Sequence, residues 1–268
     1  MRATLQIRRA GEVLTAVWDS NSFVYNGKEQ RPNVKFVDAD GLEVDGLAFH
    51  FEGDEHVKNV GNNYKIQVVL DESAYKLDTS SASCDFVITK AILNVPTLKT
   101  DSQIIYDGTA KSVAGYLDGF DEILMKIAEG GSGTDAGSYT AIIELPDSVN
   151  CEWNGISGKT VTLEWEIGKA HLTAVWDAYK HVADGEVFQP KVTGFVGLAS
   201  IDVAAINYDT DVIYSGDMGK DSVGAYSITA ALNSSALWTS NYILDVNTQR
   251  AYAIIPQEGV QVITKVWD

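Results

Sequence analysis

Apolar and polar residues alternate with a period of two in several short stretches of this chain. In each of residues 64–69, 139–143 and 226–230, a tyrosine begins an apolar set that takes every second position. Successive side chains of a strand point to opposite faces of a sheet, so each set is expected to face a core. The inward sets are Tyr64/Ile66/Val68, Tyr139/Ala141/Ile143 and Tyr226/Ile228/Ala230. The one weak helical candidate is 121–128, and the pattern predicts an all-β chain.

Turn residues separate these stretches. Asn26-Gly27, Asp107-Gly108 and Asp184-Gly185 are dipeptides that tolerate positive φ and so favour tight turns. A glycine-rich loop occupies residues 130–133. Short strands and turns within about 80 residues are typical of a small β-sandwich.

The chain also repeats itself. The hexapeptide at residues 14–19 (Leu-Thr-Ala-Val-Trp-Asp) recurs unchanged at residues 172–177. The displacement is about two modules of 79 residues, which predicts a middle copy.

Four landmarks support that middle copy, in the same order in all three copies. The first is a turn, at Tyr25-Asn26-Gly27, Tyr106-Asp107-Gly108 and Ala183-Asp184-Gly185, and the second is a glycine shortly before a tyrosine, at Gly61 to Tyr64, Gly137 to Tyr139 and Gly224 to Tyr226. The third is a single aromatic residue, at Tyr75, Trp153 and Trp238. The fourth is the closing strand, around Phe86, Trp165 and Tyr252.

The repeat map predicts three tandem Ig-like β-sandwich modules, at residues 11–90, 91–169 and 170–257, in an elongated array. Residues 1–10 read as the closing strand of a preceding repeat or as an N-terminal edge strand. Residues 258–268 read as the opening strand of a following repeat or as a C-terminal edge strand. The junctions at 89–91 and 168–170 leave almost no linker, which favours modules strung in line.

The middle copy carries the clearest family signal. Residues 106–111 (Tyr-Asp-Gly-Thr-Ala-Lys), 134–139 (Thr-Asp-Ala-Gly-Ser-Tyr) and 165–170 (Trp-Glu-Ile-Gly-Lys-Ala) resemble the bacterial MBG-type, or YDG-motif, Ig-like repeat. The third copy departs from the motif, with Ala183 for the tyrosine and Ile255-Pro256 for the Lys-Ala junction. The resemblance implies stalk, spacer or adhesion roles in surface proteins and brings no catalytic residues.

Charge and cysteine content narrow the partners. The net charge of −17 disfavours nucleic acid and anionic membranes, and no apolar run is long enough to span a bilayer. Cys84 and Cys151 fall in different predicted modules, which argues against a disulfide or a cysteine metal site. The N-terminal residues lack the apolar stretch of a signal peptide, so export would need a signal outside this sequence. We expect a monomer without membrane insertion.

No residue pattern predicts catalysis or a cofactor. His50 and His56 stand near Glu52, Asp54 and Glu55, where an exposed acidic hairpin is a simpler interpretation than a metal site. Asp38, Asp40, Glu43 and Asp45 lack the spacing of an EF-hand and read as turn residues. Residues 155–159 resemble a phosphate-binding loop only superficially. We therefore predict no catalytic residues, no metal and no cofactor.

Four tryptophans are the candidate ligand-contact or junction residues. Trp18 and Trp176 correspond to Thr97 in the middle copy, and a threonine at a core tryptophan position would leave a large cavity. We therefore expect Trp18 and Trp176 at module junctions or on the surface. Trp153 and Trp238 could form a sugar-stacking platform, although core or junction packing is the commoner use of tryptophan.

Together these features predict a non-catalytic structural or adhesive spacer of a bacterial surface or secreted protein, hence extracellular. The alternatives are modules that themselves bind a glycan or a host or matrix protein, and an accessory region of a secreted glycan-degrading enzyme.

Overall fold

The computed structural model describes residues 11–71 and 74–258, which fold almost entirely into β-strands and turns. The all-β prediction is confirmed, since the helices among these residues are three short 3₁₀ turns. The predictions for residues 1–10 and, apart from Glu258, for residues 258–268 lie outside the described residues.

The weak helical candidate at 121–128 does not form a helix. Asp121 accepts the Ile123 N–H on its side chain at 2.8 Å and the Met125 N–H on its carbonyl at 2.7 Å. These bonds close a single turn, and strand β12 (Lys126–Glu129) begins directly after it. A side chain that bonds its own backbone competes with helix propagation.

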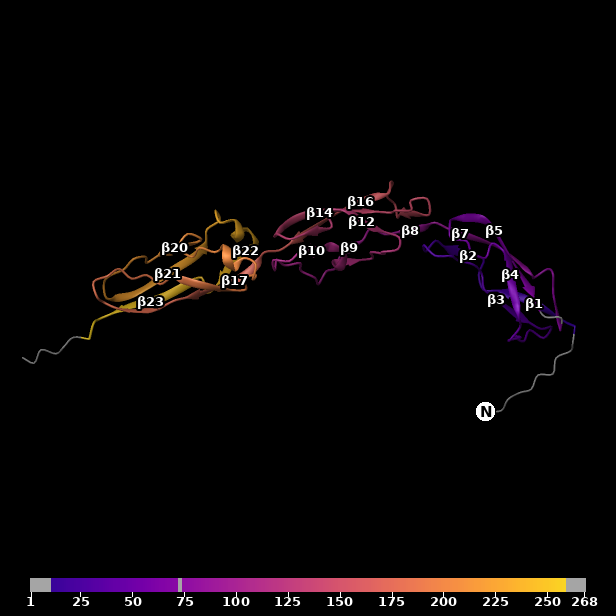
Figure 1. The fold of residues 1–268 in the computed structure, drawn as a ribbon, viewed down its shortest axis with the longest axis horizontal. Coiled ribbons are helices and arrows are strands. Elements are labelled where there is room, and N and C mark those ends of the chain that lie inside the picture. The colour runs from indigo at the N-terminus through magenta and orange to yellow at the C-terminus, as the bar shows by residue number, and fades with distance from the viewer. Residues whose placement is uncertain (1–10, 72–73, 259–268) are drawn as a thin grey trace, which may run out of the picture. The chain divides into compact units, whose positions relative to one another are not determined.

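The chain divides into two compact units, coloured along the sequence in Figure 1. Unit 1 takes residues 1–97, 118–128 and 142–162, and unit 2 takes residues 98–117, 129–141 and 163–268. Residues 91–169 are thus shared between the units. For description we call residues 11–90, 91–169 and 170–257 segments 1, 2 and 3.

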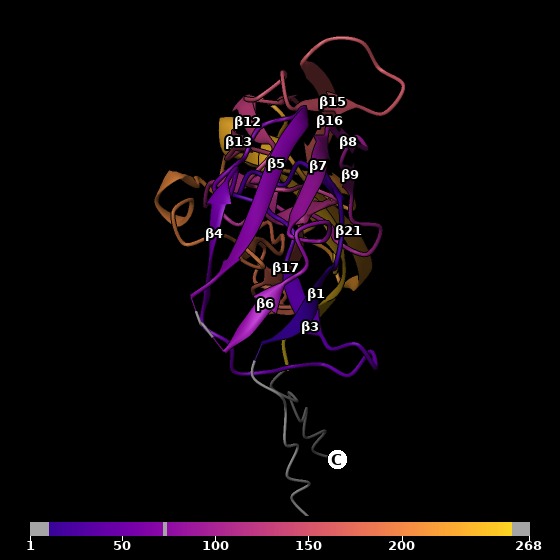
Figure 2. The same ribbon diagram turned by 90° about the vertical axis from the view of Figure 1, so that its right-hand side faces the viewer.

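Segment 1 lies wholly in unit 1 and contains two sheets, of which strands β1 and β3 to β7 are labelled in Figure 2. The first has the order β3-β1-β6 and the second β2-β7-β5-β4. Their bounds are β1 (Glu12–Trp18), β2 (Ser22–Val24), β3 (Val34–Val37), β4 (Phe49–Gly53), β5 (Gly61–Leu70), β6 (Tyr75–Leu77) and β7 (Ser83–Thr89).

Segment 3 lies wholly in unit 2 and repeats this pairing. Its sheets have the orders β19-β17-β22 and β18-β23-β21-β20. The bounds are β17 (Ala170–Trp176), β18 (Lys180–Val182), β19 (Val192–Val196), η2 (Val203–Ala205), β20 (Val212–Gly216), β21 (Gly224–Leu232), η3 (Leu237–Asn241), β22 (Tyr242–Val246) and β23 (Gln249–Ile255). The parallel pair β17-β22 matches the parallel pair β1-β6.

Segment 2 contains shorter strands. Its sheet orders are β12-β14-β16, β15-β8, β10-β13 and β11-β9. Besides β12, the bounds are β8 (Ala91–Leu93), β9 (Thr97–Leu98), β10 (Lys111–Ser112), η1 (Val113–Tyr116), β11 (Leu117–Asp118), β13 (Ser132–Gly133), β14 (Gly137–Glu144), β15 (Cys151–Trp153) and β16 (Thr160–Ile167). The parallel pair β15-β8 is the counterpart of β6-β1.

The period-two alternation is confirmed in β5, β14 and β21. Ile66, Val68, Ala141, Ile143, Ile228 and Ala230 are all buried, and the tyrosine at the start of each set is half-buried. Each of those tyrosines donates its hydroxyl to a backbone carbonyl just before its own strand. The acceptors are Asn59 for Tyr64, Asp135 for Tyr139 and Ser222 for Tyr226. The tyrosine therefore fixes the chain that enters its strand.

Candidate functional site

The turn at Asn26-Gly27, Asp107-Gly108 and Asp184-Gly185 has one backbone geometry in all three segments. The N–H of Tyr25, Tyr106 and Ala183 donates to the carbonyl of Thr89, Gly168 and Ile255 respectively, at 2.9 Å in each case. The next residue, Asn26, Asp107 or Asp184, accepts the N–H two positions on at 2.9 Å, and the glycine has positive φ. The turn prediction is confirmed, and Ala183 is the positional equivalent of the two tyrosines.

Tyr25 joins segment 1 to segment 2 within unit 1. Its side chain is buried, and its hydroxyl donates to Asp147 Oδ2 at 2.8 Å. Burial and the nearby carboxylate raise the pKa of Tyr25 to about 12. The phenol thus stays a donor while Asp147 stays an acceptor.

Asn150 completes this contact, which we call junction 1 (Tyr25, Asn59, Val60, Asp147 and Asn150). Asn150 is buried, and its Oδ1 accepts the Val60 N–H at 2.7 Å. Its Nδ2 donates to Asp147 Oδ2 at 2.7 Å and to Asn59 Oδ1 at 3.2 Å. The bond from Asn150 is the main influence that lowers the pKa of Asp147. One amide therefore links the turn of segment 2 to the strand entry of segment 1.

A second contact of the same kind lies within unit 2, where segment 2 meets segment 3. Tyr106 is buried and donates its hydroxyl to Asp202 Oδ2 at 2.7 Å. The same oxygen accepts the Tyr242 hydroxyl at 2.6 Å, and the two rings pack edge to face with centroids 5.3 Å apart. Burial, with Asp202 as the next cause, raises the pKa of Tyr106 to about 12 and also raises the pKa of Tyr242.

Asn241 has the place of Asn150 in this contact, which we call junction 2 (Tyr106, Asp135, Ala136, Asp202, Asn241 and Tyr242). Its Oδ1 accepts the Ala136 N–H at 2.7 Å, and its Nδ2 donates to Asp135 Oδ1 at 3.0 Å. Val60 and Ala136 both immediately precede the glycine that starts β5 or β14. Asn150 and Asn241 both immediately precede the strand that pairs in parallel with β8 or β17. The two junctions therefore repeat the same bond between equivalent residues.

Sequence reasoning selected the motif tyrosines but missed their partners. Asp147 and Asp202 occupy different loops, one after β14 and the other after β19, so no shared spacing marks them. Asn150 and Asn241 were missed because the repeat map aligned Trp153 with Trp238, whereas the strand register aligns Cys151 with Tyr242.

Trp18 and Trp176 are not at the junctions, and that expectation is wrong. Trp176 belongs to the buried cluster of segment 3 with Ala174 and Val192. Trp18 is half-buried and packs against the cluster that contains Leu14 and Phe36. Their indole N–H groups donate to the carbonyls of Asn247 and Ser81. Trp176 is a core residue of segment 3, and Trp18 packs at the edge of the core of segment 1.

The cavity argument failed because the strand is interrupted in segment 2, where β8 ends at Leu93 and Thr97 begins the separate strand β9. Thr97, the counterpart of Trp18 and Trp176, is exposed. Trp153 pairs with Leu93, whereas Leu14 pairs with Leu77 and Leu172 with Leu244. A buried tryptophan thus stands in segment 2 where the other two have leucine.

Neither Trp153 nor Trp238 offers a stacking surface. Trp153 is 3% exposed and Trp238 is 7% exposed. Trp238 lies in η3 and donates its indole N–H to Asp211 Oδ2 at 2.9 Å. A sugar ring needs an open aromatic face, so these residues serve packing. The structure also corrects their alignment with Tyr75, because the register matches Tyr75 with Cys151 and Tyr242.

The polar residues noted in the sequence form ordinary surface ion pairs and a turn. His50 Nδ1 lies 2.6 Å from Asp71 Oδ1, and His56 Nδ1 lies 3.0 Å from Glu29 Oε2. Asp38 accepts the N–H groups of Asp40 and Leu42, as a turn residue does. Within residues 11–71 and 74–258, no group of three or more histidine, cysteine or acidic side chains is arranged to hold a metal ion.

The loop at residues 155–159 does not resemble a phosphate-binding loop in structure. It borders a shallow hollow of about 660 Å³ together with Lys90 and Trp153. The element that follows is strand β16, not a helix, so no helix N-terminus is available for a phosphate.

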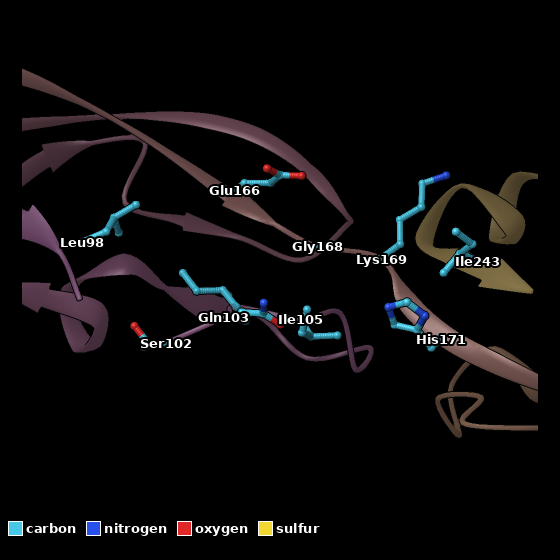
Figure 3. A pocket seen from close by; sticks show the side chains of 10 residues that line it. Leu98, Ser102, Gln103, Ile105, Glu166, Gly168, Lys169, His171 and Ile243 are labelled. Atoms are coloured by element: carbon cyan, nitrogen blue, oxygen red, sulfur yellow. The ribbon is translucent and has the colours of Figure 1, made fainter. Parts of the chain in front are cut away.

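A groove of about 460 Å³ in unit 2 lies beside the backbone that connects β16 to β17 (Figure 3). Ser102, Glu166, Lys169 and His171 are among its lining residues. His171 Nδ1 lies 2.5 Å from Asp245 Oδ2, whereas the Ser102 hydroxyl donates to the Lys99 carbonyl. Ser102 and His171 therefore do not form a nucleophile and base pair.

Comparison with known proteins adds no identification. No protein-family model matches this sequence, and no curated protein matches it. In the described part of the chain, no helix is long and apolar enough to cross a membrane.

Proposed function

We propose that the chain is a non-catalytic structural spacer, built from three Ig-like modules at residues 11–90, 91–169 and 170–257. In this proposal it belongs to a bacterial surface or secreted protein and resembles the MBG-type repeat. Its task is to hold neighbouring domains at a distance, in line and outside the cell.

The observation that supports this function best is the repeated polar junction. Asn150 and Asn241 bond equivalent backbone N–H groups at 2.7 Å, and Tyr25 and Tyr106 each bond a carboxylate of the next segment. Both carboxylate bonds are partly buried, and a hydrogen bond depends on direction and distance, so these bonds should resist bending of the junction more than apolar contact alone. Such bonds suit a chain that has to keep its modules aligned.

Stretching single molecules from both ends tests the proposal. Three modules should unfold in three events, each releasing on the order of 280 Å of chain for about 80 residues. One event that releases the whole chain would contradict the modular organisation.

Small-angle scattering tests the in-line arrangement. Modules in series should give a radius of gyration near 30 Å, against roughly 18 Å for a compact chain of this length. A value near the compact figure would remove the main physical support for a spacer.

A further inference from the structure

Segment 3 ends in a face equivalent to the two faces that form junctions 1 and 2. This end face consists of residues 183–188 and 217–224. Its turn has the same backbone bonds as the turns at Tyr25 and Tyr106, and the bridge Phe188–Lys220 matches Gln30–Val57 and Lys111–Gly133. Val223 precedes Gly224 as Val60 precedes Gly61 and Ala136 precedes Gly137.

The two equivalent faces are each covered by the following segment. A Cβ added at Gly27 would stand 2.6 Å from Ile123 Cγ2, and one added at Gly108 would stand 2.6 Å from Ile201 Cγ2. The asparagine bonds to Val60 and Ala136 lie on the same faces. Each face thus receives an isoleucine on its turn glycine and an asparagine on its strand entry.

The end face of segment 3 has neither contact within residues 11–71 and 74–258. Gly185 has nothing within 4 Å of the position of an added Cβ, and among those residues no acceptor meets the Val223 N–H. Apolar side chains are exposed here, with Val187 at 67%, Val223 at 55% and Met218 at 50%. Glu29 and Glu55 hold the positions of Val187 and Met218 in segment 1.

We propose that this end face is a docking surface for one further module of the same kind, a deepening of the spacer function proposed above. The incoming module places an asparagine amide on the Val223 N–H and a branched apolar side chain on Gly185. Because Ala183 replaces the motif tyrosine, the contact has no phenol to carboxylate bond. Val187 and Met218 supply apolar contact in its place.

A second copy of this chain is a poor occupant. In segment 1 the position of Asn150 and Asn241 is taken by Ala74, since Tyr75 pairs with Glu12 as Cys151 pairs with Ala91. The leading side of segment 1 therefore lacks the amide that would accept the Val223 N–H.

The test is to extend the chain after residue 257 with a second copy of residues 91–169, and in a separate chain with a second copy of residues 170–257. Amide hydrogen exchange is then read at Val60, Ala136 and Val223 by NMR. The chain ending at residue 257 is the reference. We expect Val223 to exchange at least about tenfold more slowly in one or both extended chains, as a newly bonded amide does.

Asn→Ala at the added copy of Asn150 or Asn241 should restore fast exchange at Val223. If Val223 is unchanged in both extended chains, or stays protected without the asparagine, the docking surface is refuted. Failure of the spacer proposal looks different, because Val60 and Ala136 would then exchange fast in every chain.

Discussion

Removing the Asn150 side chain tests the junction most directly. Asn150→Ala deletes the 2.7 Å bond from the Val60 N–H, the 2.7 Å bond to Asp147 and the 3.2 Å bond to Asn59. Neutral hydrogen bonds contribute about 1 kcal/mol net and those to a charged group about 1.5–3 kcal/mol. The long bond to Asn59 adds little, so we expect the free energy of unfolding of unit 1 to fall by about 3 kcal/mol.

The assay combines urea denaturation with amide exchange, because a chain of several modules need not unfold in one step. Exchange should accelerate first at Val60, since its N–H loses the acceptor while the core of segment 1 keeps its contacts. The effect should be smaller near segment 3, which lies in the other unit.

Asn154→Ala is the matched control. Asn154 is exposed and makes one side-chain bond, to Asn94 Oδ1 at 2.9 Å. Its removal should change stability by less than about 0.5 kcal/mol. The reasoning would be refuted if Asn150→Ala cost under about 1 kcal/mol, or no more than Asn154→Ala.

Four further predictions concern junction 1 and the aromatic packing. The pKa of Asp147 is lowered in the folded state, so the ionised carboxylate stabilises the fold above the ordinary Asp pKa of about 4, and this stabilisation is lost as pH falls through the lower folded pKa. Amide exchange at Val60, measured from pH 6 to 3, should accelerate as the stabilisation is lost. Asn150→Ala should remove most of this pH dependence. The pKa of Tyr25 is raised to about 12, so its contribution to stability is complete below pH 10 and disappears as pH rises toward 12. In a titration followed by tyrosinate absorbance, Tyr25→Phe should therefore lose one of the groups that ionise at the highest pH. Loss of a group that ionises at lower pH would contradict the geometry. Tyr139→Ala should lower the free energy of unfolding by about 3 kcal/mol in thermal or urea unfolding, because the Tyr139 ring stacks on Trp165 with centroids 4.7 Å apart and its hydroxyl bonds the Asp135 carbonyl. Tyr139→Phe removes only the hydroxyl and should cost about 1 kcal/mol. Equal costs for the two variants would mean that the ring contributes nothing. Trp176→Phe should lower the free energy of unfolding by about 1 kcal/mol more than Trp153→Phe does, because the Trp176 indole N–H donates to the Asn247 carbonyl, whereas the buried Trp153 Nε1 has no acceptor among the described residues. The reverse order would contradict these hydrogen-bond assignments.

Local sequence determined the strands and turns of this protein. The alternation around Ile66, Ala141 and Ile228 is a property of the strand itself, so it predicted the buried face without knowledge of the partner strands. The positive φ of Gly27, Gly108 and Gly185 could likewise be predicted, because an Asn-Gly or Asp-Gly pair favours positive φ in any short turn.

The positions of Trp18 and Trp176 could not be predicted from comparison of the aligned repeats alone. Trp18 and Trp176 looked unsuited to a core because Thr97 stands at their position in the middle copy. Comparison of aligned residues cannot show that the strand is interrupted in segment 2, where Thr97 lies exposed in the separate strand β9 and no core position is left for a tryptophan to fill.

Tertiary structure alone decided the junctions. Tyr25 and Asp147 are 122 residues apart, and Tyr106 and Asp202 are 96 apart. Their carboxylates come from different loops, so no periodicity or motif pairs them in advance. A hydrogen bond depends on where two atoms arrive after the strands have paired, whereas a strand or a turn depends on the preferences of residues that are neighbours in the chain.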